Sequence, residues 1–288
     1  MDCRVKGKFR TKRFKFRLTN PICVGDQVEV EKNTIDNTGS IFNLKERKNY
    51  IVRRSPQAKK AALLAANIDQ ILLIVTIRQP KTSYGFINRF LVGAEYYDIP
   101  TTIVFNKIDI NNNEDNKVLE EMRKVYENCG YKCMSISCER GDNIDKLKNL
   151  IEGKVNLFSG HSGVGKSTLL NILMPGLNRA TSPISEAWDK GTHTTTFSEL
   201  IHYNDQTWLI DAPGIREFGI VHIDDARKLD YYFVEIFEYS QHCFYQDCVH
   251  DSEPKCAVKK GLRDGKISKS RYSTYLKLLD ELKTQKTY

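Results

Sequence analysis

"GHSGVGKST", residues 160–168, decides the fold, because it matches the phosphate-binding pattern G-x-x-x-x-G-K-[ST] at every fixed position. It follows the apolar run "KVNLF" (154–158) and precedes "KSTLLNIL" (166–173), so it lies between an expected strand and an expected helix. In such a loop the backbone N–H groups surround phosphate, Lys166 reaches the reacting phosphates and the Ser167 hydroxyl binds Mg²⁺. The predicted phosphate contacts are Gly160, His161, Ser162, Gly163, Val164, Gly165, Lys166, Ser167 and Thr168.

A second motif, "WLIDAPG" (208–214), ends an apolar run with a D-x-x-G pattern. In phosphoryl-transfer sites of this kind the aspartate helps to hold Mg²⁺, and the glycine N–H is placed to sense the γ-phosphate. The pattern alone is common in turns. Its place at the end of a strand beyond the phosphate-binding loop favours these roles for Asp211 and Gly214.

Between these motifs lies "DKGTHTTTF" (189–197), which is typical of a mobile switch whose threonine completes the Mg²⁺ shell when γ-phosphate is present. Thr195 is the predicted ligand, and Thr194 is the alternative. Without the flanking motifs, a threonine run would indicate only the entrance to an ordinary strand. The predicted Mg²⁺ site therefore combines Ser167, Thr195 and Asp211.

"TTIVFNKID" (101–109) indicates a buried strand that runs into an Asn-Lys-x-Asp loop. The aspartate carboxylate of such a loop accepts hydrogen bonds from the ring N1–H and the exocyclic amine of guanine. Adenine offers no such pair of donors. "SIS" (135–137) closes the next strand, where a backbone N–H can contact the guanine O6. The predicted base-binding residues are Asn106, Lys107, Ile108, Asp109, Ser135 and Ser137.

The order of these motifs is unusual. A Ras-like GTPase runs phosphate loop, switch threonine, D-x-x-G, N-K-x-D and then the serine-containing strand, whereas here N-K-x-D comes first and D-x-x-G last. This is the same cycle opened between D-x-x-G and N-K-x-D. A sheet stays intact when old termini are joined and new ones open at a surface connection. The sequence therefore predicts a circularly permuted P-loop GTPase domain.

The chain of 288 residues is expected to form three domains: an all-β domain (1–60), the permuted α/β GTPase domain (61–223) and a mostly helical domain (224–288). In the central domain, uninterrupted apolar runs alternate with amphipathic stretches, which indicates a mainly parallel sheet buried on both faces. The expected strands are "QILLIVTI", "TTIVFNK", "KCMSISC", "KVNLFSG" and "TWLIDAP", and the expected helices lie near 86–97, 115–128, 142–152 and 166–174.

Residues 1–60 contain short β-segments with turn signals between them, as in "CRVKGKFR" and "QVEVEK". An OB-like barrel that binds RNA is one interpretation, and a small β-domain that only packs on its neighbour is the other. Residues 1–60 carry 16 Lys/Arg against 6 Asp/Glu, residues 251–288 carry 10 against 5, and the segment between them carries 18 against 25. Basic ends on an acidic centre favour a polyanionic partner, although lysine-rich ends also serve solubility alone.

The C-terminal region contains C-x4-C-x-H-x5-C, formed by Cys243, Cys248, His250 and Cys256. Three thiolates and an imidazole are a tetrahedral Zn²⁺ ligand set, and four protein ligands leave no open position, so a structural zinc is predicted. The alternative is three free thiols near a surface histidine. The other five cysteines have no metal-like spacing and are expected to be inert thiols in a reducing compartment.

The longest aliphatic run, "ILLIVTI", is too short to span a bilayer, and no apolar stretch follows the charged start of the chain. We therefore expect a cytoplasmic protein with no membrane partner. A monomer is the simplest expectation.

Together the motifs resemble the RsgA (YjeQ) family of circularly permuted bacterial GTPases. The resemblance covers nearly the whole chain and rests on "VGDQVEV", "ERKNYIVRR", "NKID", "GHSGVGKSTLLN", "THTTT", "DAPGIREFG" and the Cys/His pattern. It implies an N-terminal OB-fold, a permuted GTPase domain and a zinc-containing C-terminal domain. It also implies binding of GTP/GDP, Mg²⁺ and one Zn²⁺, and a role in late assembly of the 30S ribosomal subunit, on 16S rRNA.

One position departs from Ras-like enzymes. A glutamine that orients the attacking water often follows D-x-x-G, but here Ile215 follows Gly214, so slow intrinsic hydrolysis is expected. His193, in the predicted switch, is a candidate catalytic residue that places the water once the ribosome orders the loop. The alternative is a histidine that only makes local contacts.

Two functions follow from these motifs. The first is a GTP-driven assembly factor with ribosome-stimulated hydrolysis, in which the link after D-x-x-G carries the nucleotide state into the zinc domain. The second is a GTP-sensing RNA-binding regulatory protein that does not depend on such stimulation. A P-loop ATPase or kinase is disfavoured, because Asp109 would leave adenine unpaired.

Overall fold

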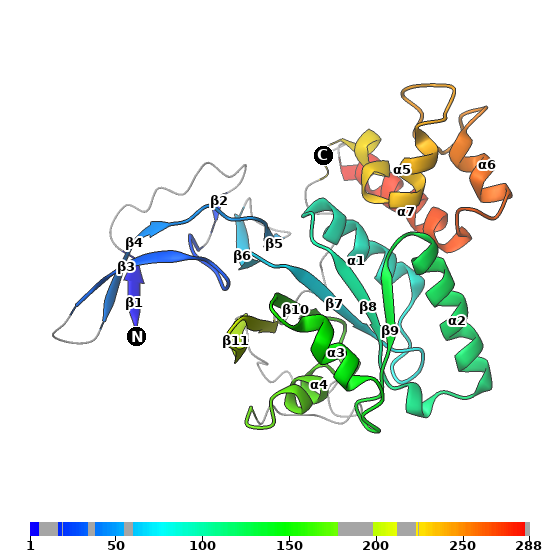
Figure 1. Ribbon diagram of the computed structural model, residues 1–288. Coiled ribbons are helices and arrows are strands. Elements are labelled where there is room, and N and C mark those ends of the chain that lie inside the picture. Colours follow the sequence, from blue (N-terminus) through cyan, green and yellow to red (C-terminus); the bar gives the residue numbers. More distant parts are fainter. Residues whose placement is uncertain are drawn as a thin grey trace.

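The computed structural model describes residues 1–5, 17–18, 20–33, 38–54, 60–177, 198–211, 223 and 225–285. Its centre is a sheet of six strands in the order β11-β12-β10-β7-β8-β9 (Figure 1). Neighbouring strands are parallel except for β11 and β12, which are antiparallel. The strands are β7 (Gln70–Val75), β8 (Thr101–Phe105), β9 (Lys132–Ser135), β10 (Val155–Ser159), β11 (Glu199–Asn204) and β12 (Thr207–Asp211).

The expected mainly parallel sheet is confirmed, and one strand adds to it. β11 was not predicted, because it is an antiparallel edge strand in which only Ile201 is buried. Such a strand has no continuous apolar run to reveal it. The five runs predicted as strands correspond to β7, β8, β9, β10 and β12.

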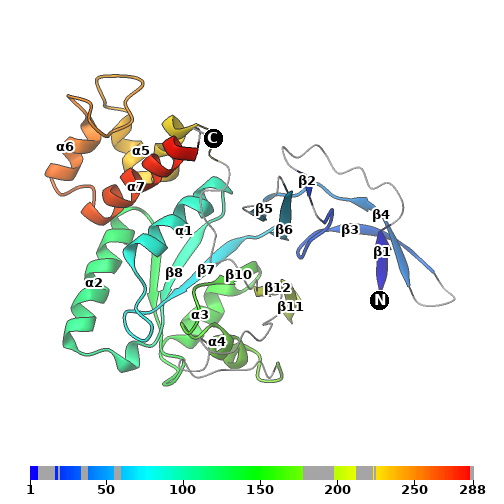
Figure 2. The same ribbon diagram turned by 180° about the vertical axis from the view of Figure 1, so that it is seen from behind.

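Helices cover both faces of this sheet (Figure 2). They are α1 (Tyr84–Tyr96), α2 (Asn113–Asn128), α3 (Ile144–Ile151) and α4 (Lys166–Leu173), near the predicted positions. Along β7, Ile71 and Leu73 belong to the apolar cluster with α1 and α2, whereas Leu72 and Ile74 belong to the cluster with α3 and α4. The strand is apolar at every one of these positions because both faces are covered.

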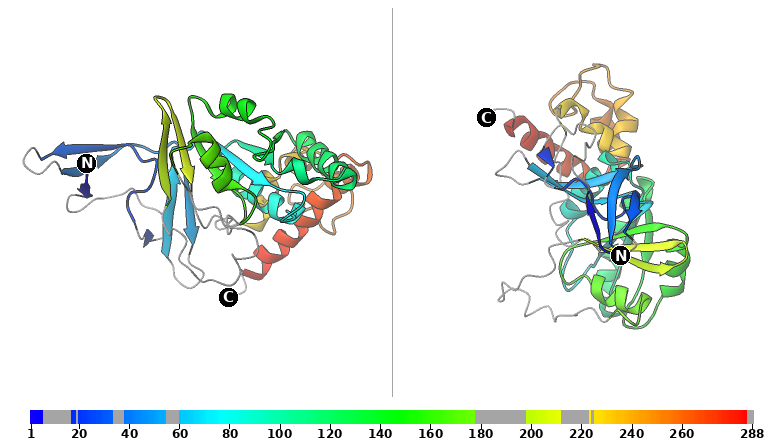
Figure 3. Two further views of the ribbon diagram at one scale, coloured as in Figure 1. Left: turned by 90° about the horizontal axis from the view of Figure 1, so that it is seen from below. Right: turned by 90° about the vertical axis from the view of Figure 1, so that its left-hand side faces the viewer.

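The N-terminal region forms two sheets, with strand orders β1-β4-β3 and β2-β6-β5. Figure 3 shows these strands extending away from the central sheet. Their bounds are β1 (Cys3–Val5), β2 (Arg17–Leu18), β3 (Val28–Lys32), β4 (Gly39–Leu44), β5 (Tyr50–Arg54) and β6 (Lys60–Ala66). β5 and β6 were not predicted, and β6 continues the N-terminal β-structure past the expected boundary at residue 60.

The C-terminal region is mostly helical, as expected, with the 3-10 turns η3 (Ala226–Lys228) and η4 (Asp230–Tyr232) before the helices α5 (Val234–Ser240), α6 (Ala257–Arg263) and α7 (Lys269–Gln285). It packs on α1, whose Val92 lies in the same apolar cluster as Phe233 and Leu278. Inside it, the Arg271 guanidinium donates two hydrogen bonds to the Glu235 carboxylate, at 2.7 and 2.9 Å. Among the helices of the described residues, none is both long enough and apolar enough to cross a membrane.

Candidate functional site

The phosphate-binding loop lies where the sequence predicts it, between the end of β10 at Ser159 and the start of α4 at Lys166. Two of its glycines are required by space as well as by backbone angle. Gly160 has φ +145°, and a Cβ there would lie 2.3 Å from the Ile74 carbonyl oxygen. Gly165 has φ +96°, and a Cβ there would lie 2.4 Å from Asn106 Nδ2. A side chain at either position would displace a neighbouring loop or strand.

Lys166 is held against its own loop. Its ammonium donates hydrogen bonds to the carbonyl oxygens of Gly160, at 2.6 Å, and His161, at 2.8 Å. Ser167 and Thr168 follow in the first turn of α4, where the helix dipole and the backbone N–H groups favour an anion. The loop, the lysine and the helix start therefore form an anion-binding arrangement.

Asn106 joins three loops. It directly follows β8 and is only 2 % exposed. Its Nδ2 donates to the Val164 carbonyl oxygen of the phosphate-binding loop, at 2.8 Å, and its Oδ1 accepts from the Cys138 backbone N–H, at 3.3 Å. The asparagine therefore fixes the N-K-x-D loop against the phosphate-binding loop and against the loop after β9.

Lys107 adopts the left-handed conformation, with φ +63°, and its ammonium donates to the Gln79 carbonyl oxygen at 2.8 Å. Burial lowers the pKa of this lysine, although the nearby Asp109 opposes the shift. The contact ties the N-K-x-D loop to the segment between β7 and α1. Ile108, the next residue, begins the 3-10 turn η1 (Ile108–Ile110), which contains Asp109.

The Asp109 carboxylate is oriented by Ser137, whereas the sequence pattern predicted for this segment a backbone contact with guanine. Ser137 Oγ donates to Asp109 Oδ1 at 2.6 Å and accepts from the Arg140 backbone N–H at 3.0 Å. Ser135 ends β9, and its carbonyl oxygen accepts from Asn143 Nδ2 at 2.9 Å. The sequence reasoning missed the Ser137 hydroxyl and the Cys138 N–H, because a short S-x-S gives no sign of which group points where.

Asp211 is the last residue of β12 and is paired in register with Phe158 of the parallel strand β10. Since carboxyl ends of parallel strands meet at one edge of a sheet, Asp211 lies at the same edge as the phosphate-binding loop. Three other predicted residues, His193, Thr195 and Gly214, lie outside the described residues, as do Thr194 and Ile215.

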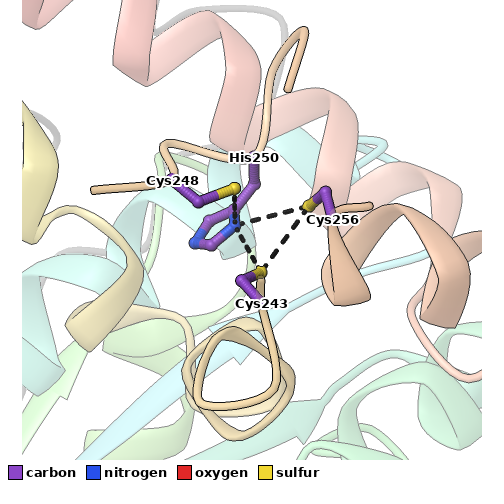
Figure 4. A group of neighbouring side chains, drawn as sticks. All are labelled: Cys243, Cys248, His250 and Cys256. Atoms are coloured by element: carbon purple, nitrogen blue, oxygen red, sulfur yellow. Dashed lines mark hydrogen bonds between the residues drawn. The ribbon is translucent and has the colours of Figure 1, made fainter. Parts of the chain in front are cut away.

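The predicted zinc ligands converge on one point (Figure 4). His250 Nδ1 lies 3.5 Å from Cys243 Sγ, 3.4 Å from Cys248 Sγ and 3.5 Å from Cys256 Sγ. Cys243 Sγ and Cys256 Sγ are 3.8 Å apart. A tetrahedron with Zn–S of about 2.3 Å and Zn–N of about 2.0 Å has edges of about 3.5 Å between N and S and about 3.8 Å between sulfurs. The four donors therefore fit one zinc ion.

The surroundings of these ligands suit a structural metal. The Ala257 backbone N–H donates to Cys243 Sγ at 3.3 Å, as a thiolate requires. Asp230 Oδ2 lies 3.6 Å from His250 Nε2, on the side of the ring away from the cysteines. The Tyr272 hydroxyl on α7 donates to the His250 carbonyl oxygen at 2.7 Å. A metal held here would connect the loop of residues 243–256 to α7.

The remaining cysteines differ from this cluster. Burial raises the pKa of Cys129 and of Cys133 to about 12, and that of Cys138 to about 11, so these thiols are protonated at neutral pH. Cys23 is partly buried, and burial also raises the pKa of its thiol. Cys3 is exposed.

Loops at one edge of a parallel sheet, with a phosphate-binding loop, an N-K-x-D loop and a D-x-x-G strand, define a P-loop GTPase whose chain order is circularly permuted. The sequence model of the RsgA GTPase family matches residues 44–221. The protein belongs to this family.

Relatives agree with this assignment over nearly the full length. The chain is 44% identical over 282 residues to small ribosomal subunit biogenesis GTPase RsgA 2 of Bacteroides thetaiotaomicron, covering 98% of this chain and 90% of the relative. The crystal structure of YjeQ from Thermotoga maritima matches with a TM-score of 0.78 and 34% identity, over 97% of this chain and 89% of that one. The crystal structure of YloQ, described as a circularly permuted GTPase, matches with a TM-score of 0.72 and 29% identity, over 98% and 86% of the two chains.

Proposed function

We propose that this protein binds the 30S ribosomal subunit, assists its late maturation and hydrolyses GTP there, with turnover stimulated by the subunit. The single observation that carries the nucleotide part is the junction at Asn106, which holds the N-K-x-D loop and the phosphate-binding loop together. The ribosomal part is supported by relatives that are named as small ribosomal subunit biogenesis GTPases.

In this proposal, guanine specificity comes from Asp109. Its Oδ1 is already engaged by Ser137, at 2.6 Å, which fixes the plane of the carboxylate. A fixed carboxylate accepts the N1–H and the exocyclic amine of guanine without losing conformational freedom on binding. Asn106 and Lys107 hold the loop that carries it, and Ile108 lies in its 3-10 turn.

The phosphates would be held by the loop of residues 160–168, with Lys166 neutralising charge on the transferred group. The residues that would hold Mg²⁺ are Ser167, Thr195 and Asp211, and the ion would offset negative charge that develops on the phosphates. Because phosphoryl transfer depends mainly on positioning and electrostatics, slow intrinsic turnover is expected where Ile215 replaces a water-orienting residue. His193 is the proposed residue that orients the water on the ribosome.

Zinc, in this proposal, has a structural role. Cys243, Cys248, His250 and Cys256 would hold one ion, and the ion would stabilise a loop that contributes little apolar core of its own. In this proposal the basic ends of the chain contact 16S rRNA, and the protein is a cytoplasmic monomer. Phosphate contacts by these ends should make subunit binding weaken steeply as salt concentration rises.

The decisive experiment measures GTP hydrolysis with and without purified 30S and 50S subunits, using the full chain and the Lys166→Ala variant. Strong stimulation by 30S subunits alone, abolished by Lys166→Ala, is expected. Tight binding to protein-free rRNA with no stimulation by 30S subunits would overturn the proposal in favour of a GTP-sensing RNA-binding protein. Subunit affinity that stays constant across a salt titration would refute the contact with rRNA.

A further inference from the structure

His161, in the phosphate-binding loop, makes a side-chain contact outside that loop. Its Nε2 lies 2.6 Å from the Thr82 hydroxyl oxygen, and its ring stands edge-on to Phe86, with centroids 5.3 Å apart and planes at 86°. Thr82 is 3 % exposed and directly precedes Ser83, the N-cap of α1. The second residue of the phosphate-binding loop is therefore connected to the start of a helix 79 positions earlier in the chain.

The partners of this histidine determine which ring nitrogen carries the proton. His161 Nδ1 lies 3.1 Å from the Ser162 carbonyl oxygen, which can only accept, so Nδ1–H is the donor there. In the neutral ring Nε2 is then an acceptor, and the Thr82 hydroxyl donates to it. Thr82 Oγ1 in turn accepts from the Thr76 backbone N–H at 3.0 Å. Donors and acceptors match at each step from Thr76 to Ser162.

The helix at the other end of this contact is firmly held. On one side, Ile87, Phe90 and Leu91 of α1 are buried in the apolar cluster against the sheet. On the other side, Asn88 Nδ2 donates to the Ser270 carbonyl oxygen at 3.1 Å and to Thr274 Oγ1 at 2.9 Å, both on α7. The helix α1 is therefore held between the central sheet and the C-terminal domain, and its start gives the loop a supported point of attachment.

We infer that His161 is a positioning residue for nucleotide binding: it attaches the phosphate-binding loop to the first turn of α1 and keeps the loop in the form that accepts phosphate. The inference rests on the proposed role of the loop. A loop held in its binding form loses less conformational freedom when the ligand arrives. Loss of the contact should therefore weaken binding and raise KM for GTP, while kcat stays unchanged because His161 does not act on the reacting atoms.

The test uses the full chain and compares two replacements at His161. His161→Asn keeps an amide donor near the Nδ1 position but is too short to reach Thr82, whereas His161→Gln places an amide oxygen near the Nε2 position. Affinity for a fluorescent GDP analogue, and KM and kcat for 30S-stimulated hydrolysis, are measured. His161→Asn should weaken binding about tenfold, in line with the loss of one buried hydrogen bond, and His161→Gln should stay within about threefold of the unsubstituted protein.

Thr82 gives an independent check. Thr82→Val removes the hydroxyl and keeps the shape, but it also leaves the Thr76 N–H without its acceptor, so it should weaken binding about tenfold or more, and Thr82→Ser should not. If the two side chains act through one bond, adding His161→Asn to Thr82→Val should weaken binding no further than Thr82→Val alone. His202→Asn, on exposed β11, replaces a histidine whose ring contacts Trp208, and it should leave binding unchanged.

The inference would be overturned by unchanged KM in His161→Asn, or by effects of Thr82→Val and His161→Asn that multiply in the double variant. The Lys166→Ala variant distinguishes failure of the positioning role of His161 from failure of the proposed phosphate site. If Lys166→Ala binds GDP normally, the loop is not the phosphate site. If Lys166→Ala loses GDP and His161→Asn does not, the site stands and only the positioning role fails. A fall in kcat rather than a rise in KM would also contradict the positioning role.

Discussion

Asn106→Asp tests the junction between the base-binding and phosphate-binding loops with a single-atom change. The side chain keeps its shape, but an oxygen replaces Nδ2, which lies 2.8 Å from the Val164 carbonyl oxygen. A hydrogen bond is lost, and a buried carbonyl then faces a carboxylate oxygen in a place that is only 2 % exposed. Leaving the buried carbonyl without its donor costs about 1–3 kcal/mol, so the junction loses about that much.

In the Asn106→Asp variant the two loops would separate without nucleotide and would have to be brought together on binding. The free-energy cost would therefore appear as weaker nucleotide affinity. A loss of about 1–3 kcal/mol corresponds to GDP binding about 5- to 150-fold weaker. Calorimetric titration with GDP measures the affinity, and urea unfolding shows whether the fold is retained. Burial raises the pKa of a carboxyl at this position, and a protonated carboxyl donates again, so the deficit should shrink as pH falls.

The matched control is Asn111→Asp, which makes the same chemical change in the same loop. The Asn111 amide lies on the exposed side, with its Nδ2 at 3.4 Å from Asn116 Oδ1. Asn111→Asp should therefore bind GDP within about twofold of the unsubstituted protein, as expected for a surface change. Equal GDP affinities for the Asn106 and Asn111 variants would refute the view that Asn106 assembles the site.

Three further predictions address the base, the zinc site and the C-terminal core. Asp109→Asn should weaken GTP binding by about tenfold or more and favour xanthosine triphosphate, whose 2-oxo group accepts a hydrogen bond where guanine donates one. Competition binding measures both affinities, and an unchanged base preference would contradict the role of Asp109. Cys256→Ser should release zinc, measured by metal analysis, and lower the melting temperature, whereas Cys3→Ser, at an exposed thiol, should retain the metal. Glu235→Gln should cost about 3–5 kcal/mol of unfolding free energy, because it leaves the fully buried Arg271 without its carboxylate partner, and Arg271→Met in addition should recover most of the loss. Burial alone would raise the pKa of Glu235, but the Arg271 guanidinium lowers this pKa below its usual value. The ion pair therefore contributes its full stabilisation above the unfolded pKa of about 4.3, and this stabilisation is lost as pH falls through the pKa of the folded state. Acid unfolding that is identical in Glu235→Gln and the unsubstituted protein would contradict this.

The sequence located candidate residues most readily where they are close in the chain. The phosphate-binding loop has its own glycine, lysine and serine spacing, and the proposed zinc ligands lie within one short loop, so both patterns could be recognised without tertiary information. β7, β8 and β10 were found because burial on both faces leaves a continuous apolar run. β11 was missed because only one of its residues is buried, so it has no such run; β5 and β6 were missed although β6, "KAALLAA", is largely apolar.

By itself, the sequence determined the class of domain, the cyclic order of the motifs and the set of four Cys/His residues proposed to hold zinc, because each depends on residue types at short, fixed spacing. Only the tertiary structure decided that Asn106 bonds to Val164, that Ser137 orients Asp109 and that His161 rests on Thr82. These pairs lie 28 to 79 positions apart in the chain. They meet because parallel strands bring their carboxyl ends, and the loops that follow them, to one edge of the sheet.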